Sequence, residues 1–416
     1  MASVKSAHLP FPLELAQELL NTYGSPLYVY QADILEQTIR HITQAFSYPR
    51  TQFRFASVTN GNISLLQIFR AKSWGLHANT PGDIYLGLQA GFAPEQIVYS
   101  GSNLNSEEMK QVLNWGVTTL NLDSVAQLQL CCEVYHSLTP SLPHFLTPSL
   151  RLGLRLNLPE ITGDSRIGVR PEEFPHAIAL TRQVGLKLSG LHFYRGTGTN
   201  ATEAFTNVID KVITTAELLP DWEYLDFGGG FGYSYHHSSA AFNWETFGTD
   251  LSNRISHLGK DIELVIEPGR AAIAGCATLL AKVVSVKWHS EKQIVGVDTT
   301  VANLSVPTVH GGYREIVAWK NRDNPAHLAS SKIYLTDICG NTTYSRDYLG
   351  KNCSLPALEI GDIIGVLDVG AYGYAMSSHF LHRPKPAEVL LEKDTHRLIR
   401  KREDYSVLLN NQLFHK

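Results

Sequence analysis

The sequence predicts an α/β protein in which a (β/α)8 TIM barrel is followed by a C-terminal β-rich, barrel-like domain. Three observations lead to this prediction. The 416 residues are too many for one ordinary hydrophobic core. Short β-type runs alternate with helical patterns from about Gln52 to Glu267. After Arg270 the alternation stops, and β-branched or alternating segments follow with few helical patterns between them.

Eight runs in the first part are typical of barrel strands. They are Gln52 to Ser57, Gly75 to Asn79, Ile97 to Ser100, Thr118 to Leu122, Ser149 to Asn157, Lys187 to Phe193, Glu223 to Phe227 and Ile262 to Ile266. Between them, apolar residues recur every three or four positions in the helical segments Ser64 to Lys72, Ser106 to Trp115, Glu172 to Val184 and Thr202 to Leu219. Eight such units predict a closed barrel with its site at the carboxyl ends of the strands.

The second domain is predicted from five later runs. They are Ala281 to His289, Gln293 to Asp298, Ser331 to Thr336, Asp362 to Asp368 and Glu388 to Leu391. Pro26 to Tyr30 also has the pattern of a strand and precedes a predicted helix from Asp33 to Phe46. We therefore expect residues 33–270 to form the barrel, and residues 1–32 to join 271–416 in the β-rich domain.

Composition excludes several classes of partner. A formal net charge of -4, with 44% hydrophobic and 18% charged residues, gives no electrostatic reason to expect nucleic acid or an anionic membrane. The five cysteines are odd in number and show no CxxC spacing, which indicates a reducing compartment. No stretch approaches the roughly 18 apolar residues of a membrane span. We expect a cytoplasmic protein that acts on small molecules.

A glycine-rich loop follows the seventh predicted strand. The run Asp226 to Gly232 contains Gly228, Gly229 and Gly230 in succession. Glycines let the backbone approach a ligand closely and direct N–H groups at an anion, as in a phosphate cradle. The alternative is a tight turn without a ligand. The position in the seventh βα loop favours phosphate.

The segment from Glu267 to Arg270 ends the eighth strand with a carboxylate and a guanidinium. A carboxylate can keep a pyridine nitrogen protonated, and arginine suits a phosphate dianion. The alternative is an ion pair that caps the barrel. His77, late in the second strand, is as well explained by a satisfied histidine at the barrel mouth as by a site residue. The histidine pair that begins at His236 lacks further ligands at suitable spacing, so no metal site is predicted.

Four motifs together resemble those of a known enzyme family. The glycine loop, Glu267 to Arg270, Asp368 to Tyr372 and Arg383 to Val389 are similar in type, order and spacing to signatures of diaminopimelate and ornithine decarboxylases. These are pyridoxal-phosphate enzymes of the alanine-racemase-like fold. The resemblance covers roughly Pro26 to Leu391. Weaker collinear matches are Leu88 to Gly91, Ser100 with Gly101, Asn121 to Ser124, and Ser165 to Gly168.

The resemblance implies a role for each matching residue. It assigns phosphate contacts to Gly228, Gly229, Gly230, Gly269, Arg270 and Tyr372, the pyridine nitrogen to Glu267, and a place near the ring to Arg155. It also implies a head-to-tail homodimer, because the family builds each active site from two subunits.

Five positions depart from the family pattern. Val58, within Phe55 to Asn60, occupies the place of the lysine that forms the Schiff base with pyridoxal phosphate, and valine cannot form an imine. Tyr194 replaces the histidine that stacks on the ring. Thr343 and Tyr344 replace a cysteine and an acidic residue that reach the partner's site, and Val306 replaces an arginine that faces the substrate. The substitutions therefore gather at the reacting carbon.

Three hypotheses follow from this pattern. In the first, a divergent enzyme binds pyridoxal phosphate non-covalently and acts on an amino acid or amine, with Tyr194, Thr343 and Tyr344 as candidate catalytic residues. In the second, the protein is a non-catalytic homologue that binds a partner subunit or senses a metabolite. In the third, the cradle holds another phosphorylated ligand. Retention of Glu267 favours the first over the third, because a general phosphate ligand needs no carboxylate at a ring nitrogen.

Overall fold

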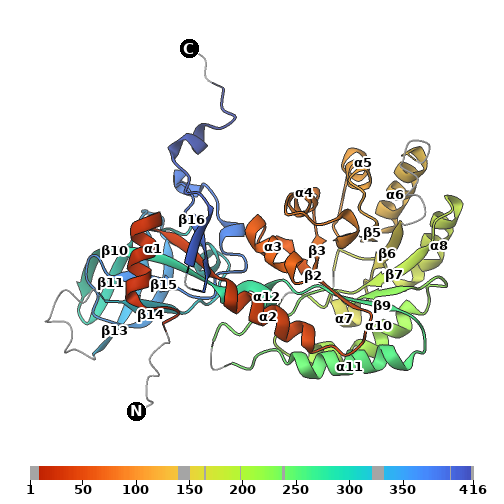
Figure 1. Ribbon diagram of the computed structural model, residues 1–416, viewed down its shortest axis with the longest axis horizontal. Helices are drawn as coiled ribbons and strands as arrows, with labels where there is room; N and C mark the ends of the chain where they lie inside the picture. The colour runs from red at the N-terminus through yellow and green to blue at the C-terminus, as the bar shows by residue number, and fades with distance from the viewer. Residues whose placement is uncertain are drawn as a thin grey trace. The chain divides into compact units, whose positions relative to one another are not determined.

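The computed structural model describes residues 9–138, 150–163, 165–196, 198–236, 239–320, 332–393 and 395–413. The chain divides into two compact units (Figure 1). The first, here called the barrel unit, contains Glu36–Ser234 and Ala240–Ala272. The second, here called the β unit, contains Met1–Leu35, Tyr235–Ser239 and Ile273–Lys416.

Eight parallel strands close into a barrel in chain order. They are β2 (Thr51–Ala56), β3 (Gly75–Ala78), β4 (Ile97–Tyr99), β5 (Thr119–Leu122), β6 (Arg151–Arg155), β7 (Leu188–His192), β8 (Tyr224–Asp226) and β9 (Glu263–Ile266). Most of their residues are buried, as expected for parallel strands covered on both faces. The predicted (β/α)8 barrel is therefore confirmed. Ser149, the first residue predicted for the fifth strand, lies outside the described residues.

Helices surround the barrel strands. The longer ones are α2 (Ala32–Gln44), α3 (Ile63–Ala71), α4 (Pro81–Gln89), α5 (Ser106–Asn114), α6 (Val125–Leu138), α8 (Phe174–Gln183), α10 (Ile209–Ala216) and α11 (Trp244–His257). Their starting points follow from local sequence. At α4, the Thr80 hydroxyl accepts a hydrogen bond from the Asp83 N–H (3.3 Å), and the Asp83 carboxylate accepts one from the Thr80 N–H (3.1 Å). No helix in the described ranges is both long and apolar enough to cross a bilayer.

The segment predicted as one helix from Thr202 to Leu219 is instead two. The short α9 (Glu203–Thr206) ends before Asn207, and α10 begins at Ile209. Val208 between them has φ -106° and ψ -6°, which is in the right-handed helical region but roughly 40° from the ideal α-helical dihedrals. Phe205 and Val208 are nonetheless both buried, so the apolar period continues across the break and conceals it in the sequence.

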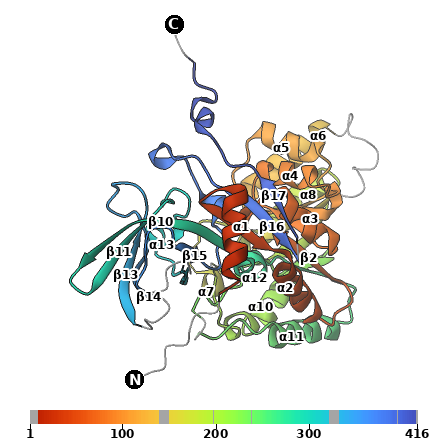
Figure 2. The same cartoon turned by 60° about the vertical axis from the view of Figure 1, so that its left-hand side comes forward.

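The β unit contains a mixed nine-stranded sheet. Its strands are β1 (Leu27–Gln31), β10 (Ala277–His289), β11 (Lys292–Val297), β12 (Ile316–Trp319), β13 (Ile333–Cys339), β14 (Tyr348–Pro356), β15 (Ile363–Val366), β16 (Ala387–Glu392) and β17 (Thr395–Arg400). The N-terminal strand β1 pairs with β10 and β16, as predicted. Figure 2 shows β11, β13 and β14 side by side at one end of this sheet. The sequence does not predict β12, β14 or β17, and Ser331 lies outside the described residues.

Tyr224 fills the barrel interior beneath the site. Its ring lies against Gly190 of β7, and its hydroxyl lies against Gly153 of β6. The hydroxyl donates a hydrogen bond to Asn121 Oδ1 (2.8 Å), which fixes the ring. The two glycines therefore make room for a large side chain that supports the layer above.

We predict that Gly190→Ala destabilises the barrel unit by about 1–3 kcal/mol, because its methyl group would overlap the fixed Tyr224 ring. Thermal unfolding of the full chain measures the effect. Gly82→Ala in α4 is the matched control, since its methyl group would meet only Thr80 Oγ1 at 3.5 Å. Equal unfolding temperatures for Gly190→Ala and the wild type would contradict the prediction.

Candidate active site

The loop after the first barrel strand carries Val58 in a short 3-10 turn, Ser57–Thr59. Two hydrogen bonds hold this turn: Ser57 Oγ donates to the His77 carbonyl (3.0 Å), and Thr59 Oγ1 donates to the Ala56 carbonyl (2.8 Å). The Val58 side chain is 44% exposed. This loop therefore presents an apolar side chain at its surface, and the correspondence of Val58 with the family's lysine stays a prediction.

No lysine of the barrel unit stands in for the missing amine. All five pair with carboxylates and have side chains 38% to 66% exposed. The pairs are Lys72 with Glu36 (2.6 Å), Lys110 with Glu107 (2.9 Å), Lys187 with Asp221 (3.8 Å), Lys211 with Glu160 (3.5 Å) and Lys260 with Glu217 (3.2 Å). Each lies on a helix, at a helix end, or just before the amino end of a strand. Among the described residues, the carboxyl ends of the barrel strands hold no lysine.

The glycine loop after β8 packs too closely for side chains. Gly228 has φ +64° and Gly230 has φ +96°, and a Cβ atom at either would overlap a backbone carbonyl of the loop after β7. A Cβ at Gly229 would lie 2.6 Å from the Glu267 carbonyl oxygen. Within the described residues, the N–H groups of Gly229 and Gly230 donate to no protein acceptor. They can therefore donate to an anion.

Arg270 follows the last barrel strand as the first residue of α12 (Arg270–Ile273). Its side chain runs past Gly198, where a Cβ atom would lie 3.2 Å from Nε. A Cβ at the preceding Gly269 would lie 2.8 Å from Thr59, in the turn that carries Val58. The predicted phosphate residues thus belong to neighbouring loops at the carboxyl ends of the strands, where an anion site is expected.

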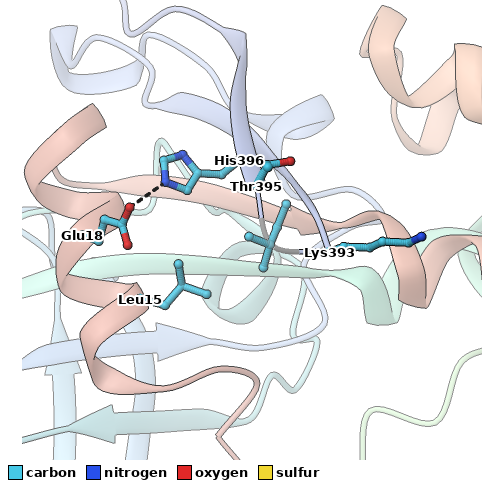
Figure 3. A pocket seen from close by; sticks show the side chains of 6 residues that line it. Leu15, Glu18, Lys393, Thr395 and His396 are labelled. Atoms are coloured by element: carbon cyan, nitrogen blue, oxygen red, sulfur yellow. Dashed lines mark hydrogen bonds and ion pairs between the residues drawn. The ribbon is translucent and has the colours of Figure 1, made fainter.

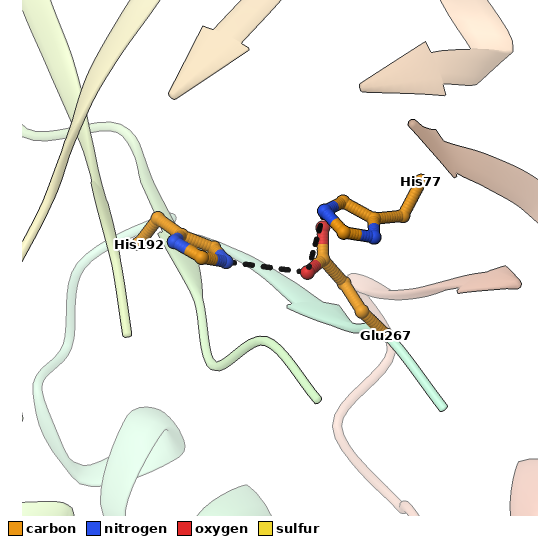
Figure 4. Close-up of side chains that lie close together, drawn as sticks. All are labelled: His77, His192 and Glu267. Atoms are coloured by element: carbon orange, nitrogen blue, oxygen red, sulfur yellow. Dashed lines mark hydrogen bonds and ion pairs between the residues drawn. The ribbon is translucent and has the colours of Figure 1, made fainter. Parts of the chain in front are cut away.

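Glu267 lies directly after β9 and is only 2% exposed. His192 Nε2 is 3.2 Å from its Oε2, and His77 Nε2 is 3.6 Å from the same oxygen (Figure 4). Burial raises the pKa of Glu267 to about 7. Burial also lowers the pKa of His192 to about 4 and holds the pKa of His77 well below its ordinary value. Among the described residues, no N–H or hydroxyl group donates to the second oxygen, Oε1, and the Glu267 carboxyl also hydrogen-bonds to the Asp226 carboxyl.

Asp226 connects Glu267 to the glycine loop and the barrel interior. Asn121 Nδ2 donates to its Oδ2 (3.0 Å), and the Gly228 N–H donates to its Oδ1 (3.0 Å). Burial, followed by repulsion from Glu267, raises the pKa of Asp226. This buried network fixes where the glycine loop begins.

Tyr194 lies two residues beyond β7. The Arg155 guanidinium is 4.9 Å from the centroid of its ring. A Cβ atom at Gly230 would lie 3.5 Å from the Tyr194 ring. The structure thus brings Arg155, Tyr194 and the glycine loop together, and it places Glu267 close enough to Arg155 for the positive charge to lower the carboxyl pKa.

The remaining predicted residues belong to the β unit. Tyr344 packs edge-to-face on Phe380, with ring centroids 5.4 Å apart. Val306 is buried at the start of α13 (Val306–Val309). Tyr372 has φ +58°. That these side chains and Thr343 meet the barrel residues stays a prediction.

The β unit also contains a cavity of about 500 Å³ that holds none of the predicted site residues (Figure 3). It is lined by Leu15, Glu18, Leu391, Lys393, Thr395 and His396. His396 links Tyr23, whose hydroxyl is 2.8 Å from Nδ1, to Glu18, whose carboxylate is 3.1 Å from Nε2. These contacts tie α1 (Leu13–Tyr23) to β17.

The sequence analysis assigned no role to His192 or Asp226 and left His77 open between a site residue and a satisfied histidine at the barrel mouth. All three occupy the last or next-to-last position of a barrel strand. That position is itself a signal, because side chains there face the site in this fold.

At the ends of its parallel strands, the barrel combines an anion-binding glycine loop, an arginine and a buried carboxylate. These features place the protein among the α/β barrel proteins that bind small molecules. Residues 32–274 match the family model described as "Pyridoxal-dependent decarboxylase, pyridoxal binding domain". The chain belongs to the pyridoxal-dependent decarboxylase family, whose cofactor is pyridoxal phosphate.

Similarity to individual members extends over nearly the whole chain. The sequence is 31% identical to the diaminopimelate decarboxylase of Methanothermobacter thermautotrophicus, over 95% of this chain and 94% of that protein. It is 28% identical to the enzyme of Aquifex aeolicus over the same shares. The crystal structure of diaminopimelate decarboxylase from Helicobacter pylori complexed with L-lysine superposes with a TM-score of 0.82 at 28% identity, covering 94% of this chain and 98% of that one.

The barrel residues fit two of the three parts of this cofactor. Within the described residues, the N–H groups of Gly229 and Gly230 have no acceptor and suit the phosphate, and Glu267 Oε1 has no N–H or hydroxyl donor and suits a protonated pyridine nitrogen. The aldehyde end has no lysine to meet it, because Val58 is apolar and every lysine of the barrel unit lies elsewhere.

We predict that Asn121→Leu destabilises the chain by about 1–3 kcal/mol for each buried group left without its partner, which are Asp226, the Tyr224 hydroxyl and the Ser100 hydroxyl. Urea unfolding measures the loss. Asn114→Leu, at an exposed position in α5, is the control and should change stability by less than about 0.5 kcal/mol. A similar small change for Asn121→Leu would show that the network does not stabilise the site.

Proposed function

We propose that this protein binds pyridoxal phosphate without a covalent bond and acts on an amino-acid or amine substrate. One observation carries the proposal: among the described residues, no N–H or hydroxyl group donates to Oε1 of the buried Glu267, which lies beside an intact glycine loop, while the carboxyl ends of the described strands hold no lysine. The groups that would bind the phosphate and the pyridine ring are thus retained, whereas the lysine that would form a covalent bond with the cofactor is not.

Each barrel residue has a distinct task in this proposal. The N–H groups of Gly229 and Gly230, with Arg270, hold the phosphate dianion. Glu267 Oε1 holds the pyridine nitrogen in its protonated form. The Tyr194 ring, in contact with the Arg155 guanidinium, provides a flat surface for stacking. When bound, the cofactor supplies an electron sink that stabilises negative charge at the reacting carbon.

Val58 limits turnover in this proposal. In the family, a lysine amine at this position displaces the product from the cofactor, and an alkyl side chain cannot do so. Release of product then depends on water. Val58 is 44% exposed, so water can reach this loop.

The substrate and the assembly are also proposals. Relatives are named diaminopimelate decarboxylases, and the Helicobacter pylori enzyme was crystallised with L-lysine, which favours an amino acid or amine. Val306 replaces an arginine of the family pattern, which removes a clamp for a substrate carboxylate. We propose a homodimer with shared sites, in which Thr343 and Tyr344 face the substrate bound to the partner's barrel.

A second candidate function is a non-catalytic subunit that binds the same cofactor or a partner chain. The absence of a lysine at position 58 favours a non-catalytic subunit as strongly as it favours an enzyme with slow turnover. Carbon dioxide release from a panel of diamino acids separates the two. Turnover above the cofactor-only rate supports the enzyme, and a bound cofactor without turnover supports the subunit.

We predict that the purified protein retains pyridoxal phosphate through gel filtration, and that borohydride does not attach it to the chain. Absorption spectra and intact mass measure this.

We also predict that Arg270→Ala raises the Kd for pyridoxal phosphate about 10- to 100-fold, because a hydrogen-bonded charge pair is lost. Arg182→Ala, with a side chain 61% exposed on α8, is the control. Stoichiometric attachment to one lysine would refute the non-covalent proposal, and failure to bind would favour another phosphorylated ligand.

We predict that Val58→Lys restores covalent attachment of the cofactor after borohydride but little decarboxylase activity, because Thr343, Tyr344 and Val306 also differ from the family pattern. Peptide mapping locates the label. Val309→Lys is the control, since Val309 is similarly exposed (48%) but lies in the β unit. Full activity on diaminopimelate in the single variant would show that those three positions do not limit the reaction.

A further inference from the structure

Three side chains with metal-binding groups converge inside the barrel mouth. His77 comes from β3, His192 from the end of β7, and Glu267 directly follows β9 (Figure 4). Each offers one ligand atom, and these atoms all lie within 4.8 Å of one another. The three residues are at most 7% exposed.

The distances suit tetrahedral coordination. Bonds of about 2.1 Å from zinc to nitrogen or oxygen require ligand atoms about 3.4 Å apart, whereas octahedral geometry requires about 3.0 Å. The two imidazole nitrogens lie 3.2 Å and 3.6 Å from Glu267 Oε2. These two values bracket the tetrahedral separation, and the two imidazole nitrogens lie within 4.8 Å of each other, a distance that a small rotation of either ring shortens.

Three ring nitrogens of the cluster lack hydrogen-bond partners within the described chain. Among the described residues, both ring nitrogens of His77 make no hydrogen bond, and neither does His192 Nδ1. The His77 Nε2 atom nevertheless points at Glu267, at a distance beyond a hydrogen bond. An ion among the three side chains gives this nitrogen a partner.

The surrounding groups include both positive charges and carboxyls. Arg54 and Arg155 contribute positive charge near His77, and Asp226 is a second buried carboxylate beside Glu267. Two imidazoles with one carboxylate are ligands of zinc-like ions, whereas Mg²⁺ and Ca²⁺ prefer oxygen ligands alone. Three protein ligands also leave a fourth position for water or another ligand.

We propose that His77, His192 and Glu267 bind a divalent transition-metal ion of the zinc class. This departs from the sequence-based expectation of no metal site. The proposal does not rest on pyridoxal phosphate, because the ion uses Glu267 Oε2 and the pyridine nitrogen is assigned to Oε1. An ion on Oε2 draws electron density from the same carboxylate, so the ion and the protonated pyridine weaken each other's binding.

The test uses the full-length protein, stripped of metal with a chelator and kept free of pyridoxal phosphate. Titration with Co²⁺ should bring one equivalent into a tetrahedral site, seen as intense visible absorption that Zn²⁺ abolishes. His77→Ala and His192→Ala should each weaken Co²⁺ binding by at least about 100-fold, since loss of an outer-shell partner alone costs 10- to 100-fold. Thermal unfolding confirms that each variant is folded, and His192→Asn replaces His192→Ala if that variant unfolds.

His396→Ala is the matched control, because His396 also contacts a glutamate at 3.1 Å but has no third ligand in the described structure. It should bind Co²⁺ like the wild type. Absence of visible absorption and of retained metal in the wild-type protein would overturn the proposal, as would unchanged affinity in both His77 and His192 variants. Pyridoxal phosphate binding by the metal-free protein is measured separately, so either proposal can fail without the other.

Discussion

The backbone hydrogen bond from the Glu267 N–H to the Gly228 carbonyl (2.8 Å) joins the ends of β9 and β8, and the site depends on it. It forms only because the glycine run lies against the neighbouring loops without side chains. A Cβ atom at Gly228 would strike the Phe193 carbonyl, and one at Gly229 would strike that of Glu267. The sequence left two interpretations of this run open, a phosphate cradle and a tight turn. The same closely packed backbone conformation satisfies both. Close packing positions the Glu267 carboxylate and leaves two N–H groups free.

The barrel could be predicted because its strands are buried on both faces and stand in the sequence as short apolar runs between turns. The missed strands lack that signal. In β17, every residue is exposed or half-buried and two of six are arginine, so it shows no apolar alternation. In β14, Lys351 and Asn352 are exposed in the middle of the strand. Both strands exist because a neighbouring strand pairs with them, a contact that local sequence does not encode.

The site residues also fall into those that the sequence predicts and those that it does not. Glu267, Arg270 and the glycines could be predicted because each motif is contiguous in the chain. The meeting of His77, His192 and Glu267 could not, because it depends on barrel register. β3 aligns His77 with Ala56 of β2, and β7 aligns His192 with Asp226 of β8. Register over eight strands is a property of the closed sheet, so a histidine at a strand end has no identifiable partner until the barrel is built.

The surroundings of Glu267 limit which ligands the protein can bind when Val58 stands in place of a lysine. A buried carboxyl oxygen without a donor costs about 1–3 kcal/mol. The contacts of Glu267 with His192 and Asp226 offset part of its burial, but no N–H or hydroxyl group of the described residues donates to Oε1. A phosphorylated ligand held by the glycine loop alone would also leave Oε1 unpaired. A protonated pyridine nitrogen satisfies Oε1 and a metal ion engages Oε2, so both proposals place an electron-poor partner at this carboxylate. If Val58 stands at the family's lysine position, as the motif predicts, the attachment point is removed and that requirement is left intact.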